Sequence, residues 1–283
     1  MNHVVDFHVH VLSQEMIDGS DRLCRRDAYF AMLCQGPEKA LATADEVLGE
    51  MDLAGIGTSV VFGYAFKDLG LCREANDYVI EAVKQHPDRL VGFCCVPPRD
   101  PGMEKEVFRC KDAGLLGIGE LFPDGQDFDL GDASHTRDLA GVARESGLCL
   151  FLHSNELVGH HYPGKGSTGP ERAWAFCSKY PDIPVILAHW GGGLAFYELM
   201  PEVRRALGNV YYDTAADPFL YEAGVYRVAR EAGVLHKVLL GTDYPLLKPG
   251  RYLRRLEEAG LTPGEQRMVG GENARGLLAK LAP

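Results

Sequence analysis

Basic residues are scarce in this sequence. Its 283 residues include 29 Lys and Arg against 40 Asp and Glu, which gives a formal net charge of −11 at pH 7. Nucleic acids and anionic membrane surfaces attract proteins that present a basic face, because both carry dense negative charge. The composition therefore argues against either as the main partner. We expect a small-molecule substrate as the partner instead.

Long apolar runs are also absent. No stretch of about 18 apolar residues exists that could span a bilayer as a helix. A secretory signal would begin with a basic and then an apolar stretch, whereas this N-terminal segment carries histidines and an aspartate, among them His3 and Asp6. We therefore expect no membrane span and a cytoplasmic location.

Paired-cysteine motifs are missing, although the chain has eight cysteines. No C-x-x-C pair and no zinc-finger spacing occurs, so the pattern does not indicate a structural zinc module. We expect reduced, buried thiols that pack as small hydrophobic groups. The eight are Cys24, Cys34, Cys72, Cys94, Cys95, Cys110, Cys149 and Cys177.

What the chain does have is an alternation of short apolar runs and longer segments of helical period, which is typical of parallel strands joined by crossover helices. We expect strands near residues 3–9, 57–63, 89–96, 115–121, 148–153, 184–189, 208–213 and 237–242. We expect helices near 43–55, 72–86, 101–114, 134–147, 169–180, 194–207, 218–234, 251–260 and 263–281.

Eight strands with interleaved helices predict an α/β fold of the (β/α)8 TIM barrel type, in a single domain over residues 1–283. A doubly wound open sheet is the alternative. No G-x-G-x-x-G opens a helix after a strand, so a dinucleotide-binding fold of that kind lacks its main support.

A pair of histidines near the end of the first strand is the most specific chemical feature. His8 and His10 stand one residue apart in Val-Val-Asp-Phe-His-Val-His. Side chains at i and i+2 of an extended segment point to the same face, about 6–7 Å apart along the strand. Both imidazoles could therefore bind one metal ion. An isolated His-x-His pair can also simply form a polar rim at the end of a strand.

Four later strands also end in a residue that can bind a metal. The active site of a TIM barrel lies at the carboxyl ends of its strands, so these side chains are expected to converge there. They are Glu120 on the fourth strand, His153 on the fifth, His189 on the sixth and Asp243 on the eighth. Together with His8 and His10 they form the predicted set of metal ligands.

Imidazole nitrogens and carboxylate oxygens suit zinc, and also manganese, iron or nickel. We expect one or two divalent ions, with zinc as the first choice. Such an ion lowers the pKa of bound water to about 7 and so supplies a nucleophile at neutral pH. Asp243 is the predicted proton acceptor, and His189 either binds a second ion, polarises the substrate or carries protons.

This set of motifs resembles the amidohydrolase superfamily, and within it the amidohydrolase-2 branch that includes aminocarboxymuconate-semialdehyde decarboxylase-like enzymes. The resemblance runs from Asp6-Phe-His-Val-His through Gly241-Thr-Asp-Tyr-Pro to Gly271-Glu-Asn-Ala-Arg. It implies that His8, His10, His153 and Asp243 bind the metal directly. It also implies that His189 is a second-metal ligand or a catalytic residue.

The sequence departs from many relatives at the fourth strand. Those relatives carry a lysine there that is carbamylated and bridges two metals, whereas this chain has Glu120. Glutamate can bridge two metals directly, as in the TatD-like deoxyribonucleases. The number of metal ions therefore stays open.

The long polar loop after His153 is a candidate for substrate binding. Lys165 and either His160 or His161 could meet an anionic group of the substrate, with Glu156 as a supporting hydrogen-bond partner. A solvated surface loop is the alternative.

Three further features have open interpretations. Trp190 and the three glycines that follow it could bring backbone N–H groups to an anion, or could form only a tight turn. Asp213 could face the pocket or accept hydrogen bonds from the next helix. The segment 13–42, with Arg22, Arg25, Arg26, Tyr29 and Phe30, could cap the pocket or form a homodimer contact, and we favour the dimer.

These features predict a metal-dependent hydrolase that attacks a C–N or C–O bond of a small, carboxylated substrate such as a cyclic amide, lactone or ester. Glu120 favours hydrolysis because it suits a binuclear centre. The alternative is a non-oxidative, metal-dependent decarboxylase or hydratase of a small carboxylic acid. A metal-binding barrel without catalysis is the least favoured hypothesis, because binding alone needs no general base beside an open metal position.

Overall fold

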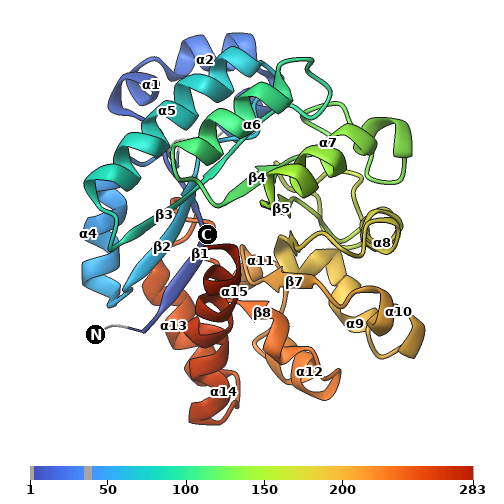
Figure 1. Ribbon diagram of the computed structural model, residues 1–283. Helices are drawn as coiled ribbons and strands as arrows, with labels where there is room; N and C mark the ends of the chain where they lie inside the picture. Colours follow the sequence, from blue (N-terminus) through green and yellow to red (C-terminus); the bar gives the residue numbers. More distant parts are fainter. Residues whose placement is uncertain (1–2, 35–39, 283) are drawn as a thin grey trace.

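A computed structural model describes residues 3–34 and 40–282 of the chain. Eight parallel strands form one sheet in the order of the sequence, and helices surround it (Figure 1). The sheet closes on itself, because Phe7 donates its backbone N–H to Leu240 at 2.7 Å and Val9 pairs with Tyr244. The fold is the predicted (β/α)8 barrel. Its strands are β1 (Val5–His10), β2 (Thr58–Phe62), β3 (Leu90–Cys94), β4 (Gly117–Leu121), β5 (Cys149–Leu152), β6 (Val185–Leu187), β7 (Val210–Asp213) and β8 (Val238–Leu239).

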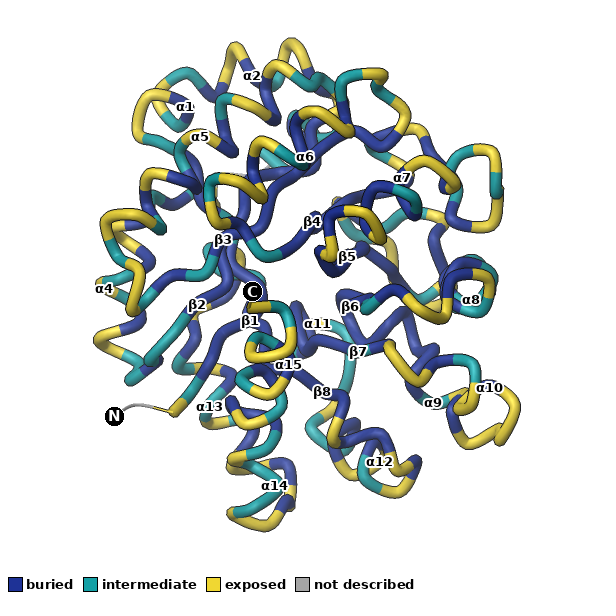
Figure 2. The backbone as a smooth tube through the Cα atoms, viewed as in Figure 1, coloured by how far each residue is buried: buried dark blue, intermediate teal, exposed yellow. Residues whose placement is uncertain are grey.

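The helices around the barrel start where the sequence places caps. Thr43 forms a reciprocal capping box with Glu46 at the start of α4, and Asp68 and Asp132 cap α5 and α7 through their side chains. Figure 2 shows the strands mostly buried and the outward faces of the helices exposed. The larger helices are α4 (Ala44–Ala54), α5 (Leu69–Gln85), α6 (Met103–Asp112), α7 (Ala133–Ser146), α8 (Pro170–Lys179), α13 (Pro249–Glu258) and α15 (Asn273–Leu281).

Three expected helices are broken in the structure. The segment 194–207 forms α9 (Leu194–Tyr197) and α10 (Pro201–Ala206), and the segment 218–234 forms α11 (Asp217–Leu220) and α12 (Val225–Glu231). A proline occupies the first turn of α10 and of α11, and proline cannot continue a helix across that position. The C-terminal segment 263–281 is also divided, into α14 (Pro263–Arg267), a π-helical segment at Met268–Glu272 and α15.

The segment between β1 and α4 contains helices that the periodicity did not predict. They are α1 (Gln14–Asp18), α2 (Ser20–Arg26) and α3 (Ala28–Leu33). Ser13 and Asp27 cap α1 and α3 through their side chains, so short polar residues start these helices. Residues 35–39 of this segment lie outside the described residues.

Four phenylalanines from four strands fill part of the barrel interior: Phe7, Phe62, Phe93 and Phe151. The Phe151 ring lies 5.3 Å from Phe62 and 6.2 Å from Phe7 between centroids, in edge-to-face geometry. The ring of His8 lies 5.1 Å from Phe151, so this aromatic layer supports the polar residues at the barrel mouth. Among the described residues, no helix is long and apolar enough to cross a membrane.

Candidate metal centre and active-site cavity

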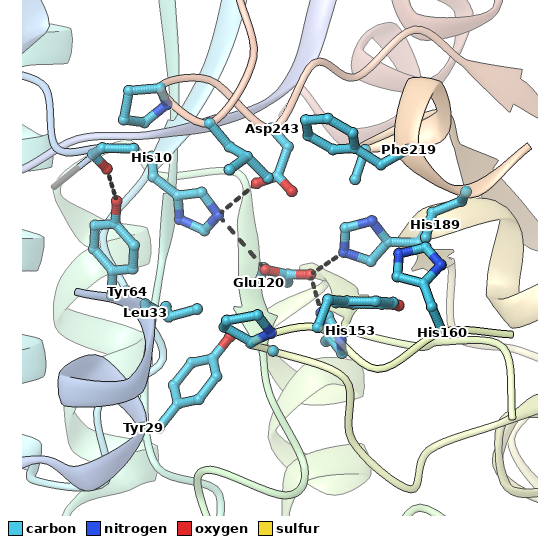
Figure 3. A pocket seen from close by; sticks show the side chains of 18 residues that line it. His10, Tyr29, Leu33, Tyr64, Glu120, His153, His160, His189, Phe219 and Asp243 are labelled. Carbon is cyan, nitrogen blue, oxygen red and sulfur yellow. Dashed lines mark hydrogen bonds and ion pairs between the residues drawn. The ribbon is translucent and has the colours of Figure 1, made fainter. Parts of the chain in front are cut away.

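The six predicted metal ligands meet at the carboxyl ends of the strands. Figure 3 labels all of them except His8. They form two groups, and within each group the candidate ligand atoms lie within 4.8 Å of one another. His8, His10 and Asp243 make up the first group, and Glu120, His153 and His189 the second.

Glu120 lies between the two groups. Its Oε2 atom is 3.6 Å from Nε2 of His8 and 3.7 Å from Nε2 of His10. Its Oε1 atom is 3.0 Å from Nδ1 of His153 and 3.7 Å from Nε2 of His189. Each carboxylate oxygen therefore faces a different group of imidazoles, as a bridging ligand would.

Hydrogen bonds to the Nδ1 atoms fix the direction of three imidazoles. Nδ1 of His10 lies 3.0 Å from the carbonyl oxygen of Gly63, and Nδ1 of His189 lies 2.9 Å from that of Ala215. A carbonyl oxygen only accepts, so Nδ1 carries the proton in both rings. His8 is held in the same way by a carboxylate oxygen of Asp213 at 2.7 Å. The Nε2 atoms are left to face the centre, which is the usual arrangement of metal-binding histidines.

The spacing of the inward-facing atoms fits a divalent ion. Nε2 of His8 and Nε2 of His10 are 3.2 Å apart, and they lie 3.5 Å and 3.4 Å from Oδ1 of Asp243. A tetrahedral ion with bonds of about 2.1 Å separates two of its ligand atoms by roughly 3.4 Å. In addition, Nε2 of His153 is buried and has no hydrogen-bond partner among the described residues. The donor set therefore fits a divalent metal ion.

Burial and mutual attraction set the charges of the cluster. Burial opposes ionisation of Glu120 and Asp243, but the neighbouring imidazoles outweigh it and hold the pKa of both carboxyl groups below the usual range. Burial likewise disfavours the charged form of His189, yet Glu120 and Asp243 raise its pKa to about 9. The cluster is thus a concentrated set of ionised carboxylates that attracts cations.

Register shifts in two strands, β1 and β4, help to orient these ligands toward the centre. β1 shifts register between Asp6 and Val9, and β4 shifts between Ile118 and Leu121. Such irregularities redirect side chains and are common beside active sites. Gly119 has a φ of +133°, and a Cβ atom there would lie 2.1 Å from the carbonyl oxygen of Phe151. Only glycine fits beside Glu120 in this conformation.

A cavity of about 460 Å³ opens beside the cluster. All the candidate ligands except His8 line it, and the remaining wall is largely apolar and aromatic. None of the described residues that line it is a lysine or an arginine. The non-ligand wall includes Tyr29, Leu33, Tyr64, His160, Tyr162, Phe219, Leu220 and Leu246.

The four residues predicted to bind substrate are placed differently from one another. His160 lines the cavity. Lys165 and Glu156 do not, because Nζ of Lys165 donates to the carbonyl oxygens of Val158 and His160, and Oε1 of Glu156 accepts from the Tyr162 hydroxyl at 3.0 Å. These two side chains therefore support the loop from within.

Trp190 is fully buried in the core rather than on the cavity wall. Its ring packs edge-on against Tyr226 at 5.3 Å and faces Phe196 at 6.4 Å. The backbone from Trp190 to Gly193 has positive φ angles, and a Cβ atom at Gly192 would lie 2.4 Å from the carbonyl oxygen of Asn155. These features favour the tight-turn interpretation of the three glycines.

For some residues that line the cavity, the sequence pattern gave little or no indication of that position. Tyr64 follows β2 in a loop, and its ring stacks on His10 at 4.6 Å. Tyr29 and Leu33 of α3 line the cavity, which favours the capping interpretation of this segment. Two of its arginines form ion pairs away from the cavity, Arg22 with Glu74 and Arg26 with Asp68. Dimer contact by this segment stays a prediction.

A closed (β/α)8 barrel with histidines and carboxylates gathered at the carboxyl ends of its strands defines the class of metal-dependent barrel enzymes. Within that class, the family model Amidohydro_2, described as amidohydrolase, matches residues 5–280. The chain belongs to this amidohydrolase family.

Several known proteins similar to this chain are decarboxylases by name. A 2-amino-3-carboxymuconate-6-semialdehyde decarboxylase of Dictyostelium discoideum is 24% identical over 311 residues, which cover 94% of this chain and 82% of that protein. A crystal structure of 2,6-dihydroxybenzoate decarboxylase complexed with 2,6-dihydroxybenzoate has a TM-score of 0.75 at 20% identity, covering 99% of this chain and 100% of that one. A dihydroxybenzoic acid decarboxylase from Polaromonas sp. JS666, with bound manganese and 2-nitroresorcinol, has a TM-score of 0.74 at 19% identity and covers 99% and 97%.

The prediction of a hydrolase is wrong in the light of these relatives, which match the decarboxylase alternative instead. The argument for hydrolysis depended on Glu120 as the mark of a binuclear hydrolytic centre. Glu120 contacts both ligand groups whichever reaction follows, so its presence does not distinguish the two chemistries. A divalent metal site fits the geometry, while the choice of zinc is not confirmed, since the Polaromonas structure contains manganese.

Proposed function

We propose that this protein is a metal-dependent, non-oxidative decarboxylase of a small carboxylic acid that carries a planar ring. The reaction breaks the bond between the carboxyl carbon and its ring or chain carbon. Carbon dioxide leaves, and one proton replaces it on the carbon that remains. No oxidant or reductant is needed, which agrees with a site built from imidazoles and carboxylates.

The mixed lining of the cavity is the observation that carries this proposal. Five of the candidate ligands line one part of it, namely His10, Glu120, His153, His189 and Asp243, and the rest of the lining includes Leu33, Phe219 and Leu220. A planar apolar ring suits such a wall, while its carboxylate reaches the ligand end. Because no described lining residue is a lysine or an arginine, a bound metal ion would supply positive charge for that carboxylate beside the imidazoles of the wall.

The residues of the chain have separate roles in this proposal. His8, His10, His153, Asp243 and Glu120 would hold the divalent ion, which as a Lewis acid orients and polarises the bound acid. His189 has a proton fixed on Nδ1 by the Ala215 carbonyl and a pKa raised to about 9, so it can hold a further proton at Nε2. Asp243 is ionised and can accept one. These two side chains manage the proton that replaces carbon dioxide.

The named relatives support this choice of chemistry. The Dictyostelium enzyme and the two benzoate decarboxylases act, by their names, on carboxylated small molecules. The substrate of this chain is proposed at the level of class only, as a ring carboxylic acid. Manganese and zinc are both candidates for the ion, because imidazole and carboxylate ligands accept either.

A substrate panel tests the proposal. The metal-free protein is reloaded with manganese or zinc and incubated with 2,6-dihydroxybenzoate, 5-carboxyvanillate and other hydroxylated benzoates. We expect at least one acid to yield carbon dioxide and the decarboxylated ring in equal amounts. The metal-free protein and the His8→Ala, His10→Ala double variant serve as matched controls without turnover. Failure of every ring acid in the panel with both metals, while a lactone or amide is hydrolysed, would overturn the proposal.

A further inference from the structure

Asp243 has an unfavourable backbone conformation at a place where the sheet gives little support. Its φ angle is +59°, in the left-handed region that residues with a Cβ atom rarely adopt. The strand β8 already ends at Leu239, before the segment that carries Asp243. A conformation of this kind persists only where its surroundings impose it. Other parts of the fold must therefore hold this segment.

A carboxylate in β1 supplies much of that support. Oδ1 of Asp6 accepts from the backbone N–H of Thr242 at 3.0 Å, and Oδ2 accepts from the Thr242 hydroxyl at 2.6 Å. The same hydroxyl oxygen accepts from the backbone N–H of Tyr244 at 3.2 Å. The residues on both sides of Asp243 are thus bound to one carboxylate, either directly or through one hydroxyl group.

We propose that Asp6 and Thr242 form a positioning pair that holds Asp243 in its metal-binding orientation. Oδ1 of Asp6 also accepts from the backbone N–H of His8 at 3.3 Å, so one side chain contacts the main chain beside two candidate ligands. Neither Asp6 nor Thr242 is a candidate ligand or lines the cavity. The inference rests on the proposed function only in that it concerns the same metal centre.

Burial makes this support hard to replace. Asp6 is 1% exposed and Thr242 is fully buried, so water does not compete for their hydrogen bonds. Without the carboxylate, the N–H and the hydroxyl of Thr242 would both lose their acceptor, and a buried donor without a partner is costly. The segment would therefore shift toward other acceptors, and Asp243 would shift with it.

A small shift of Asp243 is enough to affect a metal ion. Its Oδ1 atom lies 3.4 Å from Nε2 of His10, and the two side chains face each other in Figure 3. Oδ1 is also 3.5 Å from Nε2 of His8. Metal–ligand distances are kept within about 0.2 Å of their ideal values. The geometry that Asp6 and Thr242 impose on this turn therefore contributes to metal affinity.

Closure of the barrel is the alternative role for Asp6. The backbone N–H of Phe7 donates to Leu240 beside it, so β1 and the end of β8 meet there in any case. If Asp6 serves closure alone, its loss lowers stability but leaves the metal affinity of the folded protein unchanged. A positioning role instead lowers that affinity, and the loss depends on Asp243.

Two substitutions of Thr242 test the inference without changing any charge. Valine keeps the size and branching of threonine but lacks the hydroxyl, whereas serine keeps the hydroxyl. Affinity for zinc is measured by competition with a chelator, and the thermal unfolding midpoint shows that each variant is folded. We expect Thr242→Val to bind zinc at least about tenfold more weakly than wild type. Thr242→Ser should stay within about twofold of wild type.

A double-mutant cycle tests whether Asp6 acts through Asp243. Asp6→Asn is made in wild type and in Asp243→Ala, which keeps the other candidate ligands and so still binds zinc. We expect Asp6→Asn to weaken zinc binding at least about tenfold in wild type and less than about twofold in Asp243→Ala. An effect of the Asp6 charge on the ion through space would persist in both backgrounds.

Ser59→Ala is the matched control. Ser59 is the buried register partner of Asp6 on β2, and its hydroxyl has no partner among the described residues, so zinc affinity should not change. Equal zinc affinities in Thr242→Val and Thr242→Ser, or an equal loss from Asp6→Asn in both backgrounds, would overturn the inference. If Asp6→Asn does not fold, the two Thr242 variants decide. Since no substrate is used, a protein that binds zinc but decarboxylates no ring acid would refute the proposed function alone.

Discussion

Nδ1 of His8 lies 2.7 Å from Oδ2 of Asp213, and both side chains are fully buried. The other carboxylate oxygen of Asp213 accepts from the backbone N–H of His189 at 2.8 Å and from that of Ala215 at 3.0 Å. One aspartate at the end of β7 therefore orients a candidate ligand in β1 and the backbone of another after β6. The sequence left open whether Asp213 faces the pocket or the next helix, and the structure places it behind the ligands.

Asp213→Asn should weaken metal binding by about 10- to 100-fold, as loss of an outer partner of a metal-binding histidine does. Asparagine can accept from only one of its two side-chain atoms, so it cannot serve His8 and the backbone of His189 together. Metal affinity is measured by competition with a chelator of known affinity. Asp217→Asn is the matched control, because Asp217 is an equally buried aspartate that pairs with Arg255 and contacts no candidate ligand. Equal affinities in Asp213→Asn and wild type would contradict this role.

Asp243→Asn should lose turnover by about 10²- to 10⁴-fold, because a proton acceptor is removed. Metal content should stay close to that of the wild type, since the amide oxygen can still bind the ion and His8 and His10 remain. The measurement is kcat for an accepted ring acid, with elemental analysis of the same sample. An undiminished rate would remove Asp243 from the proton-handling role.

Ionisation of Asp217 should lower the stability of the folded protein as the pH rises from 4 to 7. Burial raises its pKa from 3.8 to about 6, although Nε of Arg255 lies 2.9 Å away. The folded state therefore binds a proton that the unfolded state releases at lower pH, and stability decreases as the pH rises through this window. The raised pKa corresponds to a loss of about 3 kcal/mol above pH 6.

The free energy of unfolding of wild type and Asp217→Asn, measured in urea at pH 4 and pH 7, isolates this effect. The pH-independent cost of the substitution cancels in the comparison. We expect wild type to lose stability relative to Asp217→Asn as the pH rises. Parallel pH profiles of the two proteins would rule out a raised pKa at Asp217.

Two phenylalanines should separate stability from substrate binding. Phe151 is fully buried, and we expect Phe151→Ala to lower the free energy of unfolding by about 3–5 kcal/mol through the cavity it leaves. Phe219 is 50% exposed and lines the active-site cavity, with Arg251 over its ring at 5.3 Å. Phe219→Ala should raise KM for a ring acid while costing less than about 1 kcal/mol of stability. A large loss of stability with unchanged KM in Phe219→Ala would contradict its place on the substrate wall.

The parts of the site that the sequence predicted follow from one geometric rule. Parallel strands of a barrel end at the same rim, so residues such as His153 and His189, which come directly after apolar runs, had to meet. The period of two likewise put His8 and His10 on one side of β1. These inferences need only the chain direction and the strand count.

The features of the site that the sequence did not predict depend on long-range packing. Tyr29 and Phe219 reach the cavity because a loop or short helix folds over the rim, and no periodicity specifies that path. Trp190 follows a predicted ligand directly, yet its left-handed backbone turns the indole into the core. The type of reaction could not be predicted from Glu120. A carboxylate between two groups of imidazoles can bind a metal ion in a hydrolase and in a decarboxylase alike.

The metal content of the wild type and of the His8→Ala, His10→Ala variant tests the central claim most directly. Both proteins are exposed to manganese or zinc, dialysed, and measured by elemental analysis, while circular dichroism checks that the barrel is folded. The account predicts at least about one ion per wild-type chain and almost none in the folded variant. Full occupancy in the variant, or a wild type that retains neither metal, would contradict it.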